Sequence, residues 1–421
     1  MSCATDDNEG SVNLAGLPPG SGVKRFREGA HRVATPEETL ARILPLMPKI
    51  GVTRLGDLTG LDRLRLPVFA AYRPNSRSLA VFQGKGADAA SAKVSALMEA
   101  TETFCAEFAK PPLRLASLRE IAGIGEVVEI TALPRVRARP FDPHEPILWT
   151  AAMDIATGAS VFVPFEIIHA NYTARAPYGS GILSATTNGL ASGNEFLEAV
   201  AHALYELVER DAVALWGLSD ARARAGRALD LGSVDCPACL GVLDEFSRAN
   251  LAVGVWDITT DIGVPAFHCL IADRDSGATD PEIGSGCHAS REVALMRALT
   301  EAAQSRATWI SGSRDDFEPQ DYRAIARARR IETGRDWLDT NPATRFRDAP
   351  TLENASIRKD LEQAARLLAR VGLTQILAVD LTDPSIGISV ARVVVPGLEG
   401  VYQTEGYIPG LRGQQLLARR Q

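Results

Sequence analysis

One eight-residue frame occurs three times along this chain and constrains its fold more than any other feature. It reads SALMEATE at residues 95–102, HALYELVE at 202–209 and RALTEAAQ at 297–304. Each copy has Ala, Leu and Glu at positions two, three and five, ends in Glu or Gln, and follows a Gly-rich turn. The copies start 107 and 95 residues apart (95 to 202 and 202 to 297), which is too long for a solenoid repeat. The repetition predicts an α+β fold in which one domain contains similar strand-and-helix units.

Helical geometry gives the acidic positions of each frame a shared face. Glu99 and Glu102, like Glu206 and Glu209, are three residues apart and project from one side of a helix, while Ala and Leu can face the core. If these helices converge, two carboxylates 4 Å apart repel by ~4 kcal/mol at an effective dielectric near 20. A divalent cation removes that cost, and hard oxygen ligands favour Mg²⁺. The alternative is a solvated acidic face on three unrelated helices.

Basic residues near the same helices indicate a nucleotide site. Lys85, Arg210 and Arg297 could face phosphate oxygens, and backbone N–H groups of the glycine turns can bind anions. Standard motifs do not account for the pattern. GKG at 84–86 lacks the Ser or Thr of a Walker A motif, and no protein-kinase catalytic loop is present. GSGCHA at 284–289 matches G-x-G-x-x-A, but a polar stretch separates it from the preceding strand-like run.

The ordered set of residues on these helices is similar to that of the YcaO-domain family, over about residues 28–400. The matching segments are S-x3-E-x2-E at 95–102, NEFLEAVAHALYELVER at 194–210, RALTEAAQSR at 297–306 and VVVPGLEG at 393–400. The resemblance implies a single YcaO-type ATP-binding domain, unrelated to P-loop or kinase folds. Its implied cofactors are ATP and Mg²⁺.

The same resemblance implies roles for individual residues. The implied Mg²⁺ ligands are five glutamates: Glu99, Glu102, Glu198, Glu206 and Glu209. The expected nucleotide contacts are polar or charged side chains: Lys85, Ser95, Asn194, Arg210, Arg297 and Glu301. Glu102, Glu209 and Arg210 are the expected catalytic residues.

Family members activate a peptide backbone amide by phosphorylating its oxygen, which turns a poor leaving group into a good one. A Cys, Ser or Thr nucleophile gives an azoline, and sulfide gives a thioamide. Many azoline-forming members end in P-x-P-x-P, whereas this chain ends YIPGLRGQQLLARRQ with one proline. Its segments REGAHRVATPEETLARI and GKGADAASAKVSALMEATE resemble the members that work with a TfuA protein.

We therefore expect thioamide formation in a ribosomally made peptide or protein, with a TfuA-like partner and a sulfide source. An azoline-forming cyclodehydratase is the alternative enzyme. A nucleotide-binding scaffold or regulator without amide chemistry is the alternative from another class. A homodimer would fit the family.

Composition bounds the partners and the location. The 421 residues are 46% hydrophobic and 23% charged, and the net charge of −7 gives no global attraction to nucleic acid or to an anionic membrane. No apolar run reaches the roughly 20 residues of a membrane span, and the acidic N-terminus lacks the features of a signal peptide. We expect a cytoplasmic protein with a flexible N-terminal tail (1–27), a catalytic domain (28–400) and a C-terminal tail (401–421).

The six cysteines are few for this length, so a disulfide framework is not expected. CPAC at 236–239 is a lone C-x-x-C without a second ligand pair nearby. It is interpreted as buried small residues or a helix start rather than as a metal or redox site. His202 heads the second frame and is either near the nucleotide or structural.

Overall fold

The computed structural model describes residues 14–20, 22–275, 280–316, 319 and 322–420. Each of the three frames lies in a long helix, namely α2 (Ala89–Glu107), α4 (Phe196–Gly217) and α7 (Arg291–Ser311). Each helix follows a strand, respectively β3 (Val81–Lys85), β8 (Leu190–Gly193) and β12 (Glu282–Cys287). The predicted recurrence of strand, glycine turn and helix is therefore confirmed.

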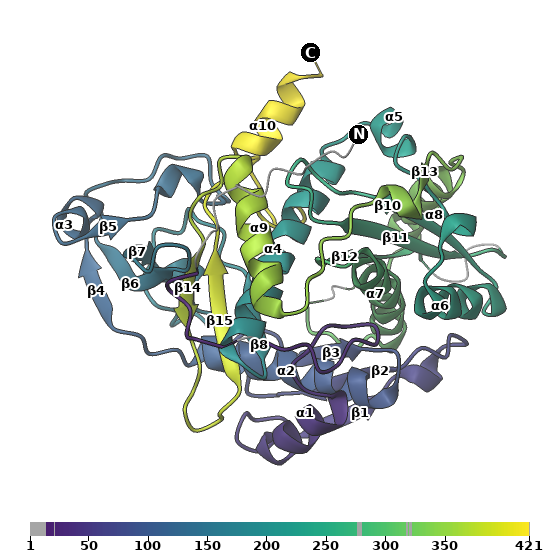
Figure 1. Ribbon diagram of the computed structural model, residues 1–421, viewed down its shortest axis with the longest axis horizontal. Coiled ribbons are helices and arrows are strands. Elements are labelled where there is room, and N and C mark those ends of the chain that lie inside the picture. Colours follow the sequence, from purple (N-terminus) through teal and green to yellow (C-terminus); the bar gives the residue numbers. More distant parts are fainter. Residues whose placement is uncertain (1–13, 21, 276–279, 317–318, 320–321, 421) are drawn as a thin grey trace, which may run out of the picture.

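The strands form two small sheets, one large sheet and a two-stranded ladder. One antiparallel sheet has the order β1 (Arg54–Asp57), β2 (Val68–Tyr72), β3, and another has the order β10 (Leu251–Asp257), β11 (Ala266–Asp273), β12. The seven-stranded sheet runs β5 (Glu126–Val127), β7 (Ser160–Pro164), β6 (Ile147–Asp154), β14 (Leu377–Asp380), β15 (Ser389–Val394), β8, with β4 (Leu113–Ala116) also on β6. The short strands β9 (Leu229–Asp230) and β13 (Thr344–Arg345) pair in parallel. Helix α4 runs between the large sheet and the β10–β12 sheet (Figure 1).

Glycine in each strand lets its own helix approach closely. A Cβ atom added at Gly84 would lie 2.1 Å from the Ala96 nitrogen, and one at Gly286 would lie 2.1 Å from the Ala294 carbonyl oxygen. The Ala and Leu residues of all three frames are fully buried: Ala96, Leu97, Ala203, Leu204, Ala298 and Leu299. The recurring pattern thus records a strand-to-helix contact that only glycine and alanine permit.

The other helices are α1 (Pro36–Ile43), α3 (Leu118–Ala122), α5 (Ala221–Ala225), α6 (Pro237–Arg248), α8 (Ala324–Leu338), α9 (Ile357–Arg370) and α10 (Leu411–Ala418). Helix α1 begins at a capping box, in which the Thr35 side chain accepts a hydrogen bond from the Glu38 N–H. Helix α9 packs along α4, and α8 packs on β10 and β11. The segment between α7 and α9 therefore contributes a helix that covers these strands.

The N-terminal segment is packed where we predicted a flexible tail. Leu14 and Leu17 are buried in the core. Lys24 forms an ion pair with Asp360 of α9, and both side chains are almost fully buried. The prediction is therefore wrong for residues 14–20 and 22–27, because these residues bury apolar and charged side chains. Residues 1–13 lie outside the described part of the chain.

The C-terminal segment is tied to α4 by two buried carboxylates. Asp211 accepts hydrogen bonds from the Glu399 N–H at 3.0 Å and from Arg412 Nε at 2.9 Å. Glu399 in turn accepts from the N–H groups of Gly410 at 2.8 Å and Gly413 at 2.7 Å. Buried carboxylates are costly without such donors, so α10 and the turn before it complete the structure around α4.

Among the described residues, neither a membrane-spanning helix nor a disulfide is found. None of the helices assigned there is long and apolar enough to cross a membrane. The cysteines described there are all buried and free. Cys236 stands at the N-cap of α6 and Pro237 is its first helical residue, which confirms the helix-start interpretation of CPAC.

Candidate functional site

The predicted site residues come together where α2, α4 and α7 meet the end of β3. Lys85 Nζ lies 2.5 Å from Glu301 Oε2, which joins β3 to α7. Arg297 Nη2 of α7 lies 4.0 Å from Glu209 Oε2 of α4. Glu102 of α2 accepts a 3.0 Å hydrogen bond from the Ser192 hydroxyl of β8. Three units that are distant in sequence therefore share one charged centre.

One half of this centre, here called the acidic half, consists of Glu99, Glu102 and Glu206. Burial raises the pKa of Glu99 to about 7. Burial also raises the pKa of Glu102 well above its usual range, and the carboxylates of Glu99 and Glu206 raise it further. The pKa of Glu206 is raised by burial as well, despite the nearby guanidinium of Arg210. Glu102 has like charges as its charged neighbours, while Arg314 and Lys85 lower the pKa of Glu99 without offsetting its burial.

The acidic half fits a hard divalent cation by its chemistry. Buried, mutually repelling carboxylates offer only oxygen donors, as Mg²⁺ prefers, and a cation would restore their ionised form. Within the described residues, however, no three Asp, Glu, His or Cys side chains are arranged to hold a metal ion. The chain thus supplies neighbouring donors without a preformed cage.

The other half, here called the paired half, consists of Lys85, Glu209, Arg210, Arg297 and Glu301. Burial alone would raise the pKa of Glu301, but the charges of Lys85 and Arg210 lower it to about 2. Arg210 Nη1 lies 3.1 Å from Glu209 Oε1, and the opposite oxygen of Glu209 accepts the N–H of Cys287 at 3.0 Å. Each acid here has a cationic partner. The three cations Lys85, Arg210 and Arg297 are also the groups of this half that could bind phosphate oxygens.

Glu198 and Asn194 have hydrogen-bond and ion-pair partners outside the acidic half. Glu198 Oε2 accepts the N–H of Val33 at 2.9 Å, and Arg32 Nη1 lies 3.6 Å from Glu198 Oε1. The side-chain oxygen of Asn194 accepts a hydrogen bond from Arg42 Nη1 at 2.9 Å. Ser95 is half-buried on α2, one turn before Glu99.

Sequence reasoning missed two arginines in this region. Arg32 approaches Glu198, and its charge also acts on His202, whose pKa burial, Arg32 and Arg297 together lower well below the usual range. Arg392 of β15 is 2% exposed and donates from Nε to the Ile167 carbonyl at 2.8 Å. A lone arginine in the apolar run ISVARVVVP was the available signal for this residue.

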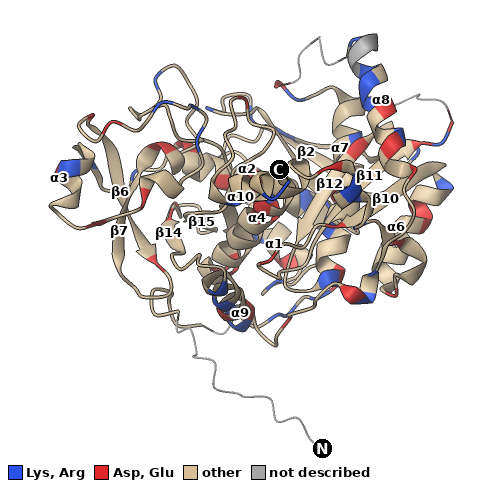
Figure 2. Cartoon of the chain, turned by 90° about the horizontal axis from the view of Figure 1, so that it is seen from above, with Lys and Arg blue, Asp and Glu red and all other residues tan. Residues whose placement is uncertain are grey.

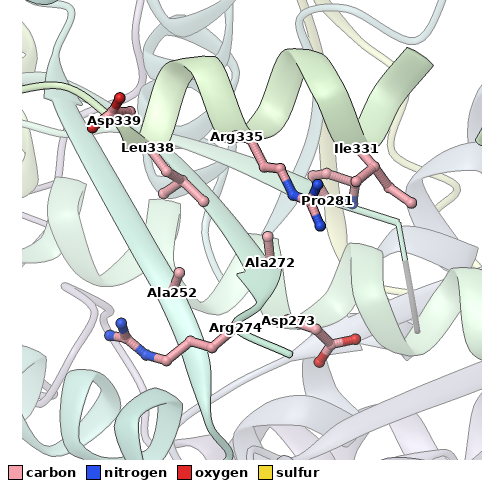
Figure 3. A pocket seen from close by; sticks show the side chains of 9 residues that line it. All are labelled: Ala252, Ala272, Asp273, Arg274, Pro281, Ile331, Arg335, Leu338 and Asp339. Carbon is pink, nitrogen blue, oxygen red and sulfur yellow. The ribbon is translucent and has the colours of Figure 1, made fainter. Parts of the chain in front are cut away.

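His202 lies beside Arg297, one of the predicted nucleotide contacts. Its Nε2 atom is 3.1 Å from Arg297 Nη1. Both residues line a cavity of about 50 Å³ together with Arg32, Glu198 and Tyr205. A larger cavity of about 350 Å³ lies elsewhere, between α8 and the strands β10 and β11, and none of the predicted site residues lines it (Figure 3).

Comparison with known proteins supplies the family. The family model described as YcaO cyclodehydratase, ATP- and Mg²⁺-binding, matches residues 83–399. An uncharacterized protein in the tfuA 3′ region of Rhizobium leguminosarum bv. trifolii is 38% identical over 375 residues, 87% of this chain and 88% of that protein. An uncharacterized protein of Methanothermobacter thermautotrophicus is 36% identical over 372 residues, 86% of this chain and 94% of that protein.

Two solved structures share the fold. YcaO from Methanopyrus kandleri, bound with AMPPCP and Mg²⁺, has a TM-score of 0.72 at 23% identity, covering 90% of this chain and 95% of that one. A heterocyclase in complex with substrate and cofactor has a TM-score of 0.75 at 24% identity over 92% of this chain. This chain spans 55% of that heterocyclase. At these identities the likeness concerns the fold alone.

These findings confirm three predictions made from the sequence. The family match covers more than half of the chain, and the fold is the single α+β YcaO domain that was expected. ATP and Mg²⁺, the predicted cofactors, are those of the family. The chain belongs to the YcaO family of ATP- and Mg²⁺-binding, cyclodehydratase-like proteins.

Proposed function

We propose that this protein uses ATP and Mg²⁺ to activate a backbone amide of a ribosomally made peptide or protein and converts it to a thioamide. Hydrosulfide adds to the carbonyl carbon, and the amide oxygen takes the γ-phosphoryl group, leaving ADP. The carbon–oxygen bond then breaks and releases phosphate, and loss of a proton gives the thioamide. A TfuA-type protein would help to supply the sulfide.

The observation that carries this proposal is the contact of an acidic half with a paired half. Glu99, Glu102 and Glu206 repel one another when buried, while Arg210 and Arg297 stand beside Glu209. Phosphoryl transfer needs positioning and charge neutralisation more than covalent help, and this combination supports both. Bound Mg²⁺ would supply neutralisation of the phosphate oxygens.

The residues of this chain divide the work accordingly. We assign five glutamates as Mg²⁺ ligands: Glu99, Glu102, Glu198, Glu206 and Glu209. We assign six residues as nucleotide contacts: Lys85, Ser95, Asn194, Arg210, Arg297 and Glu301. Glu209 also orients Arg210, since their side chains lie 3.1 Å apart. As a metal ligand, Glu198 would share its carboxylate between the cation and the Val33 N–H from which it accepts a hydrogen bond.

One observation favours sulfide over a side-chain nucleophile. The relative that is 38% identical lies in a tfuA 3′ region. Azoline formation is the second candidate, since the family model is described as a cyclodehydratase. A scaffold without amide chemistry is the third.

Peptide-dependent phosphate release tests the enzyme against the scaffold. The protein is mixed with ATP, Mg²⁺, sulfide, a TfuA-type protein and a candidate peptide. Mass spectrometry then separates exchange of oxygen for sulfur from loss of water, the azoline result. Glu102→Ala and Glu209→Ala should lose ATP–Mg²⁺ binding, while Glu292→Ala, at an exposed site on α7, should keep it. Normal binding by both site variants would refute the assignment.

A further inference from the structure

The larger cavity is a groove whose hollow comes from two alanines. It measures about 350 Å³ and lies between α8 and strands β10 and β11. Ala252 and Ala272 are directly paired across these strands and form its floor. Figure 3 shows Leu338 and Arg335 extending from α8 toward the strands. Small side chains at two facing positions thus leave space that the helix does not fill.

Helix α8 is held over the sheet by contacts on either side of residue 280. Arg327 Nε lies 3.0 Å from the Asp280 carboxylate, which is buried and also pairs with Arg330. A Cβ atom added at Gly334 would lie 2.5 Å from Cγ of Pro281, which lines the groove, so α8 touches the chain closely there. These contacts fix the distance between α8 and the strands, and with it the depth of the groove.

Two arginines of the groove are available to a ligand. Arg335 and Arg274 line it, and neither forms an ion pair with any described residue. Asp273, by contrast, is already paired with Arg63 and Arg306. Asp339 is the remaining acid and stands beyond Leu338 at the far end (Figure 3). Two free guanidinium groups beside an apolar floor favour carboxylates that flank an apolar side chain.

We infer that this groove binds an acidic stretch of an extended peptide. Its carboxylates would meet Arg274 and Arg335, and an apolar side chain would cover Ala252 and Ala272. The volume is at the low end of ligand sites, which span about 300–1,000 Å³, and suits a few side chains rather than a folded partner. The net charge of −7 repels acidic peptides elsewhere, so these arginines would direct them here.

The groove is connected to the reaction centre through α7. The Asp273 carboxylate, next to Arg274 in the chain, lies 3.5 Å from Arg306 Nη2. Arg306 is on α7, the helix that also carries Arg297 and Glu301. The inference rests on the proposed function in one respect, namely that the acidic stretch belongs to the peptide substrate. Holding it here would keep a second part of the peptide on the helix that serves the reaction.

Fluorescence anisotropy of a labelled peptide of alternating glutamate and leucine tests the groove directly. The full chain at low salt should bind it, and the double variant Arg274→Glu/Arg335→Glu should weaken binding by roughly 10- to 100-fold. The matched control is Arg329→Glu, which changes an exposed charge on α8 outside the groove and should leave affinity unchanged. In Figure 2, basic and acidic residues lie close together along the ribbon of α8. Ala252→Met keeps the charges but fills the floor, and it should also weaken binding.

Three results would overturn the inference. These are equal loss in the Arg329→Glu control, equal binding of a lysine–leucine peptide, and competition by glutarate at the same concentration as the peptide. The last would mark a site for small dicarboxylates. The assay contains no nucleotide, so a chain that binds the peptide but never releases phosphate would refute the proposed function alone. Phosphate release without binding in the groove would refute this inference alone.

Discussion

The acidic and paired halves of the charged centre both use residues of the repeated strand-and-helix units. They differ in whether their carboxylates have cationic partners. In the acidic half, Glu102 and its neighbours are buried beside like charges. In the paired half, Glu301 has Lys85 at 2.5 Å and keeps a pKa of about 2. Only the first half needs a cation from outside to become stable in its ionised form. The second half is already neutralised and can offer its cations to phosphate.

The difference shows that carboxylates alone do not identify a metal site. Glu209 lies between the halves, since it pairs with Arg210 and also raises the pKa of Glu206. Removing a charge from either half should therefore have different consequences.

Glu206→Gln removes one charge from the acidic half and preserves its shape. Peptide-dependent phosphate release should fall roughly 10²- to 10³-fold, the range seen when a group that stabilises transition-state charge is lost. The Mg²⁺ concentration needed for half-maximal rate should rise. Steady-state kinetics over a Mg²⁺ titration measures both values. An unchanged Mg²⁺ requirement would remove Glu206 from the acidic half as we describe it.

Gly286→Ala tests whether both halves depend on the same close packing. A methyl group there meets the Ala294 carbonyl at 2.1 Å, so the free energy of unfolding should fall by about 3 kcal/mol. Gly84→Ala should cost a similar amount, since its methyl group meets Ala96 equally closely. The control is Gly241→Ala on α6, where the added methyl group meets nothing within 4 Å. Denaturant unfolding would separate the halves if only one variant were destabilised.

Lys85→Met removes a cation from the paired half. Affinity for the Mg²⁺–nucleotide should fall roughly 10- to 100-fold, as for a lost hydrogen bond to a charged group. Thermal stability should change little, because the Lys85–Glu301 pair is partly exposed and such pairs contribute weakly. Calorimetric titration and thermal unfolding of one sample give both values. A large loss of stability with normal nucleotide affinity would make this pair structural.

Glu282→Gln tests how a buried carboxyl with a raised pKa affects stability when it lies outside the acidic half. Burial, aided by Asp280, raises the pKa of Glu282 to about 8 from 4.5. Its contribution to stability is therefore fully present below pH 4.5 and is lost as pH rises through about 8. The variant should unfold at the same temperature as the parent at acid pH and roughly 2 °C higher at alkaline pH. Mg²⁺ with nucleotide should leave this difference unchanged, whereas its disappearance would place Glu282 in the acidic half.

The sequence predicts the parts of this protein that depend on local signals. Glycine turns, the period of Ala and Leu, and the capping box at Thr35 each act within one or two turns of helix. They were sufficient for the long helices and for the charged centre, because the centre uses the same frame three times. The family resemblance, carried by ordered motifs, then supplied ATP and Mg²⁺.

Contacts between distant segments could not be predicted in this way. Arg32 meets Glu198 across 166 positions (198 minus 32), and β14 enters the large sheet between β6 and β15. The sequence around Lys24 does not indicate that its side chain is buried against Asp360. Such pairings depend on the packing of whole layers, so a flexible tail was predicted where the chain is folded onto the core.

The buried carboxylates of Asp211 and Glu399 receive hydrogen bonds from residues beyond the end of the family match. The family match ends at residue 399, but the donors that satisfy these acids come from Gly410, Arg412 and Gly413. A chain cut at the end of the match would leave two desolvated charges, one of them adjacent to Arg210 in α4. The hydrogen-bonded unit therefore extends beyond the residues that the family model matches. Its last residues can diverge in sequence only while they keep supplying hydrogen-bond donors to a helix nearly 200 residues earlier.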